Sequence, residues 1–108
     1  MRTVRVNGLP LTERQLRALP VRLPDGDYWY DRSCGAFGRW KGPIAGFLRP
    51  GLDLGGPMTR DCSGGGTGVF VNGRELHPLD LLVLSRIVGT LRPGHYRLSA
   101  RGILGSAA

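Results

Sequence analysis

The sequence predicts an α+β fold built from two strand-helix-hairpin copies related by approximate internal two-fold symmetry. Residues 4–19 and 69–84 align without a gap and match at seven of sixteen positions. Each copy is followed by a turn and a β-favouring stretch, and a glycine-rich segment joins the two. A chain of 108 residues has the length of one domain, and a repeated unit pairs because one copy cannot cover its own apolar face. The expected division is a first copy at 3–38, a connecting segment at 39–68 and a second copy at 69–105.

The first copy begins with a short strand at residues 4–6, whose valines face one side. An Asn-Gly pair follows and supplies the positive φ angles of a sharp turn. Thr12 and Gln15 have the spacing of a capping box, in which each side chain bonds the other's backbone amide. We therefore expect a short helix over residues 13–19, and Pro20 marks its end.

A hairpin follows this helix. Residues 24–27 read Pro-Asp-Gly-Asp, which is a strong turn signal. The next residues, 28–30, are Tyr-Trp-Tyr, and aromatic residues favour strands. The arms of the hairpin are therefore expected at residues 28–30 and 36–37.

The second copy repeats this order with a more apolar helix. His77 stands at the expected helix cap and Pro78 at the first helical position, where its missing N–H costs nothing. The helix over 78–88 is apolar nearly all round, so it should be buried on most sides, inside the fold or in an oligomer interface. A hairpin at 96–98 and 102–105 completes the copy. The residues expected to carry self-association are Leu79, Leu82, Val83 and Arg86.

The connecting segment is rich in glycine and proline, but its apolar residues recur too regularly for a solvated tether. We expect an ordered, irregular segment that lies across both copies and adds those residues to a shared core. Only residues 63–68 read as flexible. The apolar residues are Ile44, Phe47, Leu48, Leu52, Leu54 and Met58.

The charge is strongly basic. The formal net charge is +7 with a pI near 10.7, which permits nucleic acid, an acidic protein or an anionic membrane surface as partner. Lys41 is the single lysine, and the arginines are scattered rather than clustered into a basic arm. No stretch approaches the roughly twenty apolar residues of a membrane span. The first residues lack the apolar core of a secretory signal, so a cytoplasmic location is expected.

No reaction chemistry is expected. The glycine-rich run at 61–68 precedes a strand and lacks Gly-Lys-Ser/Thr, so it differs from a phosphate-binding loop. A nucleophile, base and carboxylate could be assembled only from residues that many chains contain. The cysteines and histidines match no zinc-finger spacing. We therefore expect no catalytic residue, metal or cofactor; the residues weighed were Cys34, Asp61, Cys62, Ser63, His77, Asp80 and His95.

Most aromatic residues gather around the first hairpin, beside three basic ones. Residues 28 and 30 share one face of a strand and residue 29 takes the other, so one set should face solvent or the connecting segment. Exposed aromatics beside arginine suit bases, sugars or a protein hot spot, whereas a small aromatic core is the alternative. The candidate binding residues are Tyr28, Trp29, Tyr30, Arg32, Arg39, Trp40 and Lys41.

Two phrases, PDGDYWYD at 24–31 and TGVFVNGRELH at 67–77, resemble those of a group of small bacterial proteins of unknown activity. The resemblance implies a natural bacterial origin and carries no activity, cofactor or catalytic residue. The expected function is therefore a non-enzymatic protein-interaction or self-assembling module, in which unequal copies favour a head-to-tail ring or filament. The alternative is nucleic-acid binding through the arginines and the aromatic hairpin.

Overall fold

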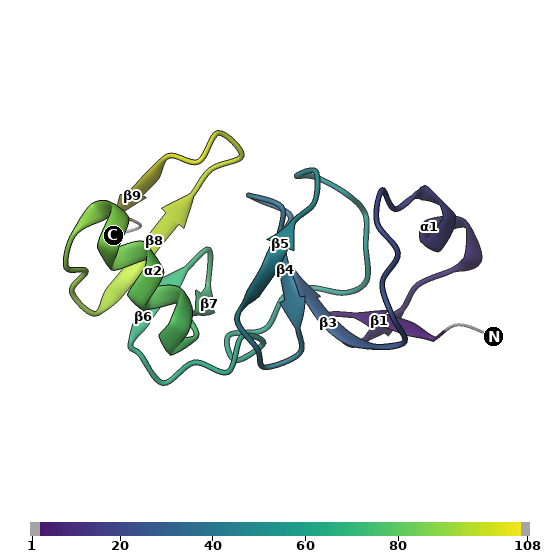
Figure 1. Cartoon of the computed structure of the whole chain (residues 1–108), viewed down its shortest axis with the longest axis horizontal. Helices are drawn as coiled ribbons and strands as arrows, with labels where there is room; N and C mark the ends of the chain where they lie inside the picture. Colours follow the sequence, from purple (N-terminus) through teal and green to yellow (C-terminus); the bar gives the residue numbers. More distant parts are fainter. Residues whose placement is uncertain (1–2, 107–108) are drawn as a thin grey trace.

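The computed structural model describes residues 3–106 and contains two mixed β-sheets, each accompanied by one helix (Figure 1). The predicted α+β class is confirmed. The molecule is elongated, with principal extents of 44 × 25 × 22 Å, and the two sheets lie one after the other along the long axis. We call them the N-terminal sheet and the C-terminal sheet.

The N-terminal sheet has five strands in the order β2-β1-β3-β4-β5. Strands β1 and β3 are parallel, and helix α1 lies in the connection between them; the other neighbours are antiparallel. The β4–β5 register shifts between Phe37 and Gly38, which is a β-bulge. The bounds are β1 Val4–Val6, β2 Leu9–Pro10, α1 Glu13–Ala18, β3 Gly26–Tyr30, β4 Ala36–Arg39 and β5 Ile44–Phe47.

The C-terminal sheet has four strands in the order β7-β6-β8-β9. Its pairings match those of the first four N-terminal strands, with β6 parallel to β8 and helix α2 in the connection. Both hairpins predicted from the sequence are present, whereas β2, β5 and β7 were not predicted. The bounds are β6 Val69–Val71, β7 Arg74–Glu75, α2 Pro78–Val88, β8 Gly94–Leu98 and β9 Leu104–Ser106.

The helix starts form as their sequences predict. Thr12 Oγ1 accepts the N–H of Gln15 at 3.1 Å, and the Gln15 side chain accepts the N–H of Thr12 at 2.9 Å, which completes the capping box. His77 Nδ1 accepts the N–H of Leu79 at 3.1 Å, so the cap of α2 is a histidine. The observed helix α1 ends one residue earlier than expected, and α2 has the expected bounds.

The two Asn-Gly turns explain why the repeat preserves asparagine. Asn7 has φ 50° and its side chain bonds both backbone groups of Tyr30, at 3.0 and 3.1 Å. Asn72 has φ 55° and bonds both backbone groups of Leu98, each at 3.0 Å. Asparagine tolerates this left-handed conformation, and its amide supplies one donor and one acceptor to the neighbouring parallel strand.

Three apolar clusters fill the molecule. One joins α1 to the N-terminal sheet and another joins α2 to the C-terminal sheet. The third, which we call the junction cluster, lies between the sheets and contains Trp29, Cys34, Ala36 and Cys62, with Trp40, Ile44, Met58 and Leu98 packed against it. The two sheets therefore share a core in addition to having their own.

The connecting segment packs as expected except at Phe47, which was expected in the core and is 62% exposed. Leu48 and Leu54 belong to the core of the N-terminal sheet, and Met58 packs against the junction cluster. The expectation of flexibility from residue 63 onward is wrong for Ser63, because this residue is fully buried and accepts a hydrogen bond from Arg74. The segment also contributes β5, whose pairing with β4 its glycine content obscured.

Replacing Asn7 tests how the turn holds β1 to β3. Asn7→Ala removes three side-chain hydrogen bonds and places a less tolerant residue at φ 50°, so we expect a loss of about 2–4 kcal/mol in the free energy of unfolding. Asn7→Gly keeps the backbone freedom and loses only the bonds, so it should cost less. Urea unfolding measures both. Equal, wild-type midpoints for the two variants would contradict this role.

Candidate interaction site

A buried arginine joins the two sheets. Arg74, in β7, is 1% exposed, and its guanidinium carbon lies 4.1 Å from the centroid of the Trp29 ring of β3. Its Nη1 donates to Ser63 Oγ at 2.9 Å, and its Nη2 lies 4.0 Å from Asp31 Oδ2. One cation therefore contacts the N-terminal sheet, the connecting segment and its own sheet, and its charge is balanced by a carboxylate that is equally buried.

The environment of Arg74 explains its ionisation. Burial lowers the pKa of the guanidinium, and the carboxylate of Asp31 opposes that shift. An arginine keeps its charge under such conditions because its ordinary pKa is so high. Within residues 3–106, the Nε of Arg74 has no hydrogen-bond partner. The buried guanidinium is thus held by the Trp29 ring, the Ser63 hydroxyl and the Asp31 carboxylate, and its Nε–H lacks a partner among the described residues.

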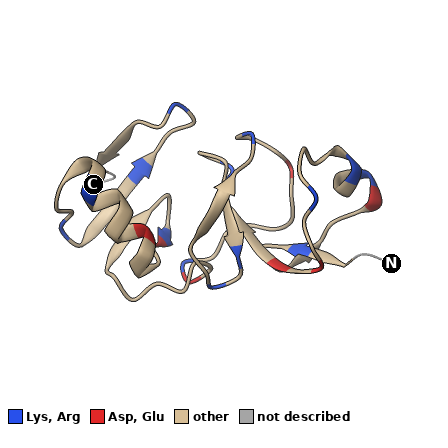
Figure 2. Ribbon diagram, viewed as in Figure 1, with Lys and Arg blue, Asp and Glu red and all other residues tan. Residues whose placement is uncertain are grey.

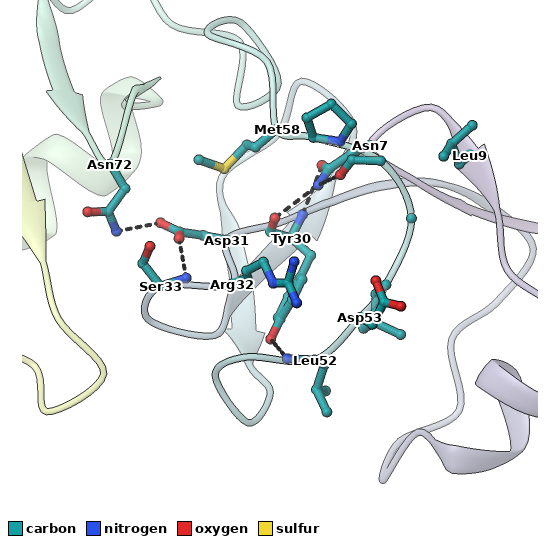
Figure 3. A pocket seen from close by; sticks show the side chains of 14 residues that line it. Asn7, Leu9, Tyr30, Asp31, Arg32, Ser33, Leu52, Asp53, Met58 and Asn72 are labelled. Atoms are coloured by element: carbon teal, nitrogen blue, oxygen red, sulfur yellow. Dashed lines mark hydrogen bonds between the residues drawn. The ribbon is translucent and has the colours of Figure 1, made fainter.

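Asp31 also connects the sheets directly. Its carboxylate accepts the amide of Asn72 at 2.8 Å and the backbone N–H of Ser33 at 2.9 Å (Figure 3). Asn72 belongs to the turn between β6 and β7, so the bond crosses from one sheet to the other. Arg74 and Asn72 therefore both approach the Asp31 carboxylate from the C-terminal sheet.

A pocket of about 520 Å³ opens beside Asp31 (Figure 3). Residues 52–58 of the connecting segment form one wall, and Asn7, Tyr30 and Arg32 contribute to the others. The Asn7 and Tyr30 side chains already have hydrogen-bond partners. The Asn7 amide donates to the carbonyls of Tyr30 and Gly56, and Tyr30 Oη accepts the N–H of Leu52 at 3.1 Å. Asn7 and Tyr30 therefore help to hold the connecting segment in place.

The aromatic side chains of β3 are core residues. Tyr28, Trp29 and Tyr30 are 4%, 0% and 3% exposed, so their faces are closed to a ligand. The two tyrosines pack in the core of the N-terminal sheet, and Trp29 faces the connecting segment through the junction cluster, as one expectation required. Their polar atoms all bond backbone carbonyls: those of Pro24, Gly42 and Arg49.

The remaining candidate binding residues lie near the surface without forming a common site. Arg39 stacks over the Tyr28 ring at 5.1 Å, and Lys41 pairs with Asp61 at 3.1 Å. Arg32 is exposed at the pocket beside Asp31, and Trp40 is half-buried against the junction cluster. The hairpin thus supplies three exposed basic groups and no open aromatic face.

Helix α2 carries several exposed large apolar side chains. None of its residues is buried, although Leu81 and Leu84 pack against the core of the C-terminal sheet. The four residues expected to self-associate are all exposed. Large apolar side chains left exposed along the helix are Leu79 at 56%, Leu82 at 53%, Val83 at 58%, Ile87 at 74% and Val88 at 48%.

An apolar groove of about 330 Å³ runs between α2 and β5. Val83 and Ile87 form the helix wall, and Ile44 and Phe47 form the strand wall. The floor comes from the C-terminal sheet and includes Arg74 along with apolar residues: Val71, Leu76, Leu98 and Leu104. Asp80 of α2 also lines the groove. The sequence did not reveal the groove, because it depends on β5 and on how the two sheets are placed.

Asp80 ties the two walls together at one end. Its carboxylate oxygens accept the N–H of Ile44 at 3.0 and 3.1 Å, which joins the first turn of α2 to the start of β5. Burial raises the pKa of Asp80, and this hydrogen bond and the Arg74 charge act in the opposite direction. The position aligned with Gln15 therefore serves a tertiary contact instead of a capping box.

The cysteines, Ser63 and the two histidines each have a different structural environment. Cys34 and Cys62 are buried free thiols, and desolvation raises the pKa of each to about 11. Ser63 Oγ accepts from Arg74, His77 caps α2, and the His95 ring stacks on Phe70 at 4.6 Å. Among the described residues, no group of three or more His, Cys, Asp or Glu side chains is placed to hold a metal ion.

The described part of the chain has no helix with the length and apolarity to cross a membrane.

Comparisons with known proteins find partial relatives in a plant. The chain is 39% identical over 87 residues to the extra-large guanine nucleotide-binding protein 1 of Arabidopsis thaliana, covering 75% of this chain and 10% of that protein. It is 33% identical over 89 residues to the extra-large guanine nucleotide-binding protein 2 of the same plant, covering 77% and 10%. The chain thus spans about a tenth of the length of the curated relatives it matches. No family profile matches the chain, and no solved structure matches it significantly.

Replacing Arg74 tests whether its buried charge links the two sheets. Arg74→Met leaves Asp31 buried without its counter-charge, so we expect a loss of about 3–5 kcal/mol in the free energy of unfolding. Adding Asp31→Asn to that variant removes the unpaired charge and should recover part of the loss. Urea unfolding measures both, with Arg5→Met at an exposed position of β1 as the matched control. A stability equal to that of the control would contradict the role.

Proposed function

We propose that this chain is a non-enzymatic protein-interaction module and that its docking surface is the exposed apolar face of α2. The observation that carries the proposal is that an eleven-residue apolar helix has no buried residue. Covering a half-exposed Leu, Val or Ile side chain contributes about 1 kcal/mol, so several such residues on one helix favour association. A contiguous apolar face on an otherwise polar surface is typical of an interface.

The difference between the two copies supports this assignment. Helix α1 is six residues long, and its Leu16 is buried, whereas α2 is nearly twice as long and leaves its apolar residues exposed. We infer that the copies arose by duplication and are related by an approximate two-fold axis, since both asparagines make the same pair of strand bonds. Unequal copies of one unit favour head-to-tail contacts, which lead to rings or filaments.

The plant relatives fit an accessory role. They are named as guanine nucleotide-binding proteins, and this chain corresponds to about a tenth of their length. The chain contains no Gly-Lys-Ser/Thr phosphate-binding pattern. We therefore propose that the shared segment serves protein contacts and leaves nucleotide binding to other parts of such proteins.

Placing a charge on the exposed apolar face of α2 tests the proposal. Leu82→Glu places a charge at the centre of that face, at a position 53% exposed, so the fold should stay intact. We expect the wild-type chain to self-associate or to retain a protein from the native host, and the variant to lose that contact. Sedimentation over a range of about 1 µM to 1 mM, run beside affinity capture from the host, measures both outcomes.

The control is Val21→Glu, an exposed apolar position outside both helices and 44% exposed. It should behave as the wild type does. If the wild type stays monomeric and retains the same proteins as Leu82→Glu, the proposal fails.

One observation favours the second candidate, nucleic-acid binding. On the C-terminal sheet Phe70 stacks with His95 at 4.6 Å, and the guanidinium carbon of Arg60 lies 5.2 Å from the Phe70 ring. His95 and Arg60 are exposed, and Arg97 follows on the same side of β8. A sheet face that combines aromatic rings with arginines suits stacking on bases and pairing with phosphates.

A binding measurement distinguishes this candidate. If it holds, single-stranded oligonucleotides bind the chain at low salt, and affinity falls steeply as salt rises because counterions are released. Arg60→Ala removes one phosphate contact and should weaken binding and reduce the salt slope by about one. Arg17→Ala, on the exposed side of α1, is the matched control. An absence of binding at low salt eliminates the candidate.

A further inference from the structure

The groove between α2 and β5 has a strand edge as one of its walls. Strand β5 is the last of the N-terminal sheet, and its strand partner in the described chain is β4. The N–H of Ile44 points to Asp80 of α2, so the edge of β5 that is not paired with β4 faces the groove. One wall of the groove therefore offers backbone hydrogen-bonding groups in addition to side chains.

The hydrogen bonds around β4 show which backbone groups are open. Leu48 N–H donates to the carbonyl of Gly35 at 2.7 Å, and Asp31 N–H donates to the carbonyl of Ala36 at 2.8 Å. Ala36 therefore directs its backbone toward β3, which makes its pair with Phe47 a non-hydrogen-bonded pair of the antiparallel ladder. The N–H and C=O of Phe47 consequently point away from β4, into the groove.

The other walls complete a site for an extended segment. The Phe47 side chain is 62% exposed on the strand side, and Val83 and Ile87 are 58% and 74% exposed on the helix side. The floor is apolar except for Arg74, whose Nε lacks a partner among the described residues, and Asp80 of α2 lines the closed end. A strand edge facing a helix across an apolar floor is the arrangement that accepts an added peptide strand.

The charges at the open end select the occupant. Phe47 and Leu104 both line the groove, so the loop after β5 and the turn between β8 and β9 lie near the same end. Each carries arginine, Arg49 in the loop and Arg101 in the turn, and Figure 2 shows basic positions on both segments. Residues 99–103 and 45–52 contain no acidic residue. A second copy of this chain brings a net charge of +7 to that end, which is repulsive.

We propose that the groove binds an extended segment of an acidic partner protein by strand addition to β5. Apolar side chains of the segment fill the space between Phe47 and the wall of Val83 and Ile87, and its acidic residues meet Arg49 and Arg101. The proposal rests on the proposed interaction function of α2 and adds the partner's chemistry and its backbone contact. It uses the groove side of the helix, whereas Leu79 and Leu82 form the outer side.

A random peptide library displayed on phage and selected on the full chain supplies the probe. We expect enriched peptides of about five to eight residues that alternate apolar and polar positions and carry acidic residues at one end. The best of them, made synthetically, should slow hydrogen exchange at the Phe47 amide. Side-chain docking alone leaves that amide unprotected. Absence of enrichment, or enrichment of peptides with helical i, i+3, i+4 spacing, overturns the proposal.

Single substitutions test the helix wall and the β5 backbone contact separately. Val83→Glu closes the helix wall and should weaken the selected peptide about tenfold or more. Phe47→Pro removes the N–H that faces the groove while leaving β4 its partners, and it should weaken binding about fivefold to tenfold. Val21→Glu is the matched control and should bind as the wild type does. Backbone amide spectra confirm that each variant is folded, and equal affinity for Val83→Glu and the control overturns the proposal.

The charge contribution has its own test. Arg49→Gln combined with Arg101→Gln should lower the affinity for the acidic peptide and weaken the dependence of that affinity on salt. Unchanged affinity and salt dependence contradict the acidic-partner assignment. If Leu82→Glu disrupts association while no peptide is selected, the interaction function stands and the strand-addition proposal falls.

Discussion

The structure depends on how one buried cation is satisfied. Arg74 stacks on Trp29 and is balanced by Asp31, and these three residues come from both sheets. Removing charges from water is costly, so such a pair persists only where both partners are held rigidly. The rigidity comes from close packing: a side chain at Gly38 would run into the Trp29 indole and the backbone of Pro43. The position of the C-terminal sheet is therefore set by a contact that tolerates little change.

A second link fixes the remaining freedom. Asp80 binds the backbone of Ile44, so α2 is attached to β5 as well as to its own sheet. With contacts at both the Arg74 junction and the Asp80 bond, α2 and β5 are held at a fixed distance. A groove formed in this way exists before a ligand arrives, and preformed sites lose less entropy on binding. The polar links thus explain how an apolar surface is kept open.

Much of the fold was predictable because its signals are local. The asparagine-glycine turns, the Thr12–Gln15 capping box and the Pro78 helix start each depend on neighbouring residues, and each formed as expected. The placement of the sheets was not predictable, because it depends on contacts between distant residues. In the aligned copies Arg74 stands where the first copy has Leu9, and this exchange of an apolar residue for a charge was the available signal.

The candidate site shows the same division. The apolar character of α2 predicted burial on most sides, inside the fold or in an oligomer interface. Burial inside the fold is wrong, because none of the helix residues is buried and Leu79, Leu82 and Val83 are exposed. The aromatic run of β3 looked like a surface because its composition suits binding, yet alternation alone does not say whether both faces are covered. Both are covered here, by α1 and the connecting segment on the two sides. Whether both faces of a strand are buried depends on the rest of the chain, so the sequence of that strand alone does not predict it.

The register shift at Gly38 limits what the free edge of β5 can do. An unprotected edge strand invites unlimited pairing between identical molecules, which is the route to aggregates. Here the bulge interrupts the ladder, Asp80 occupies the amide of Ile44, and Arg49 places a positive charge just beyond the strand. The open stretch is too short and too basic to propagate a continuous sheet from copy to copy. We therefore expect these features to disfavour edge-to-edge pairing of β5 between identical molecules.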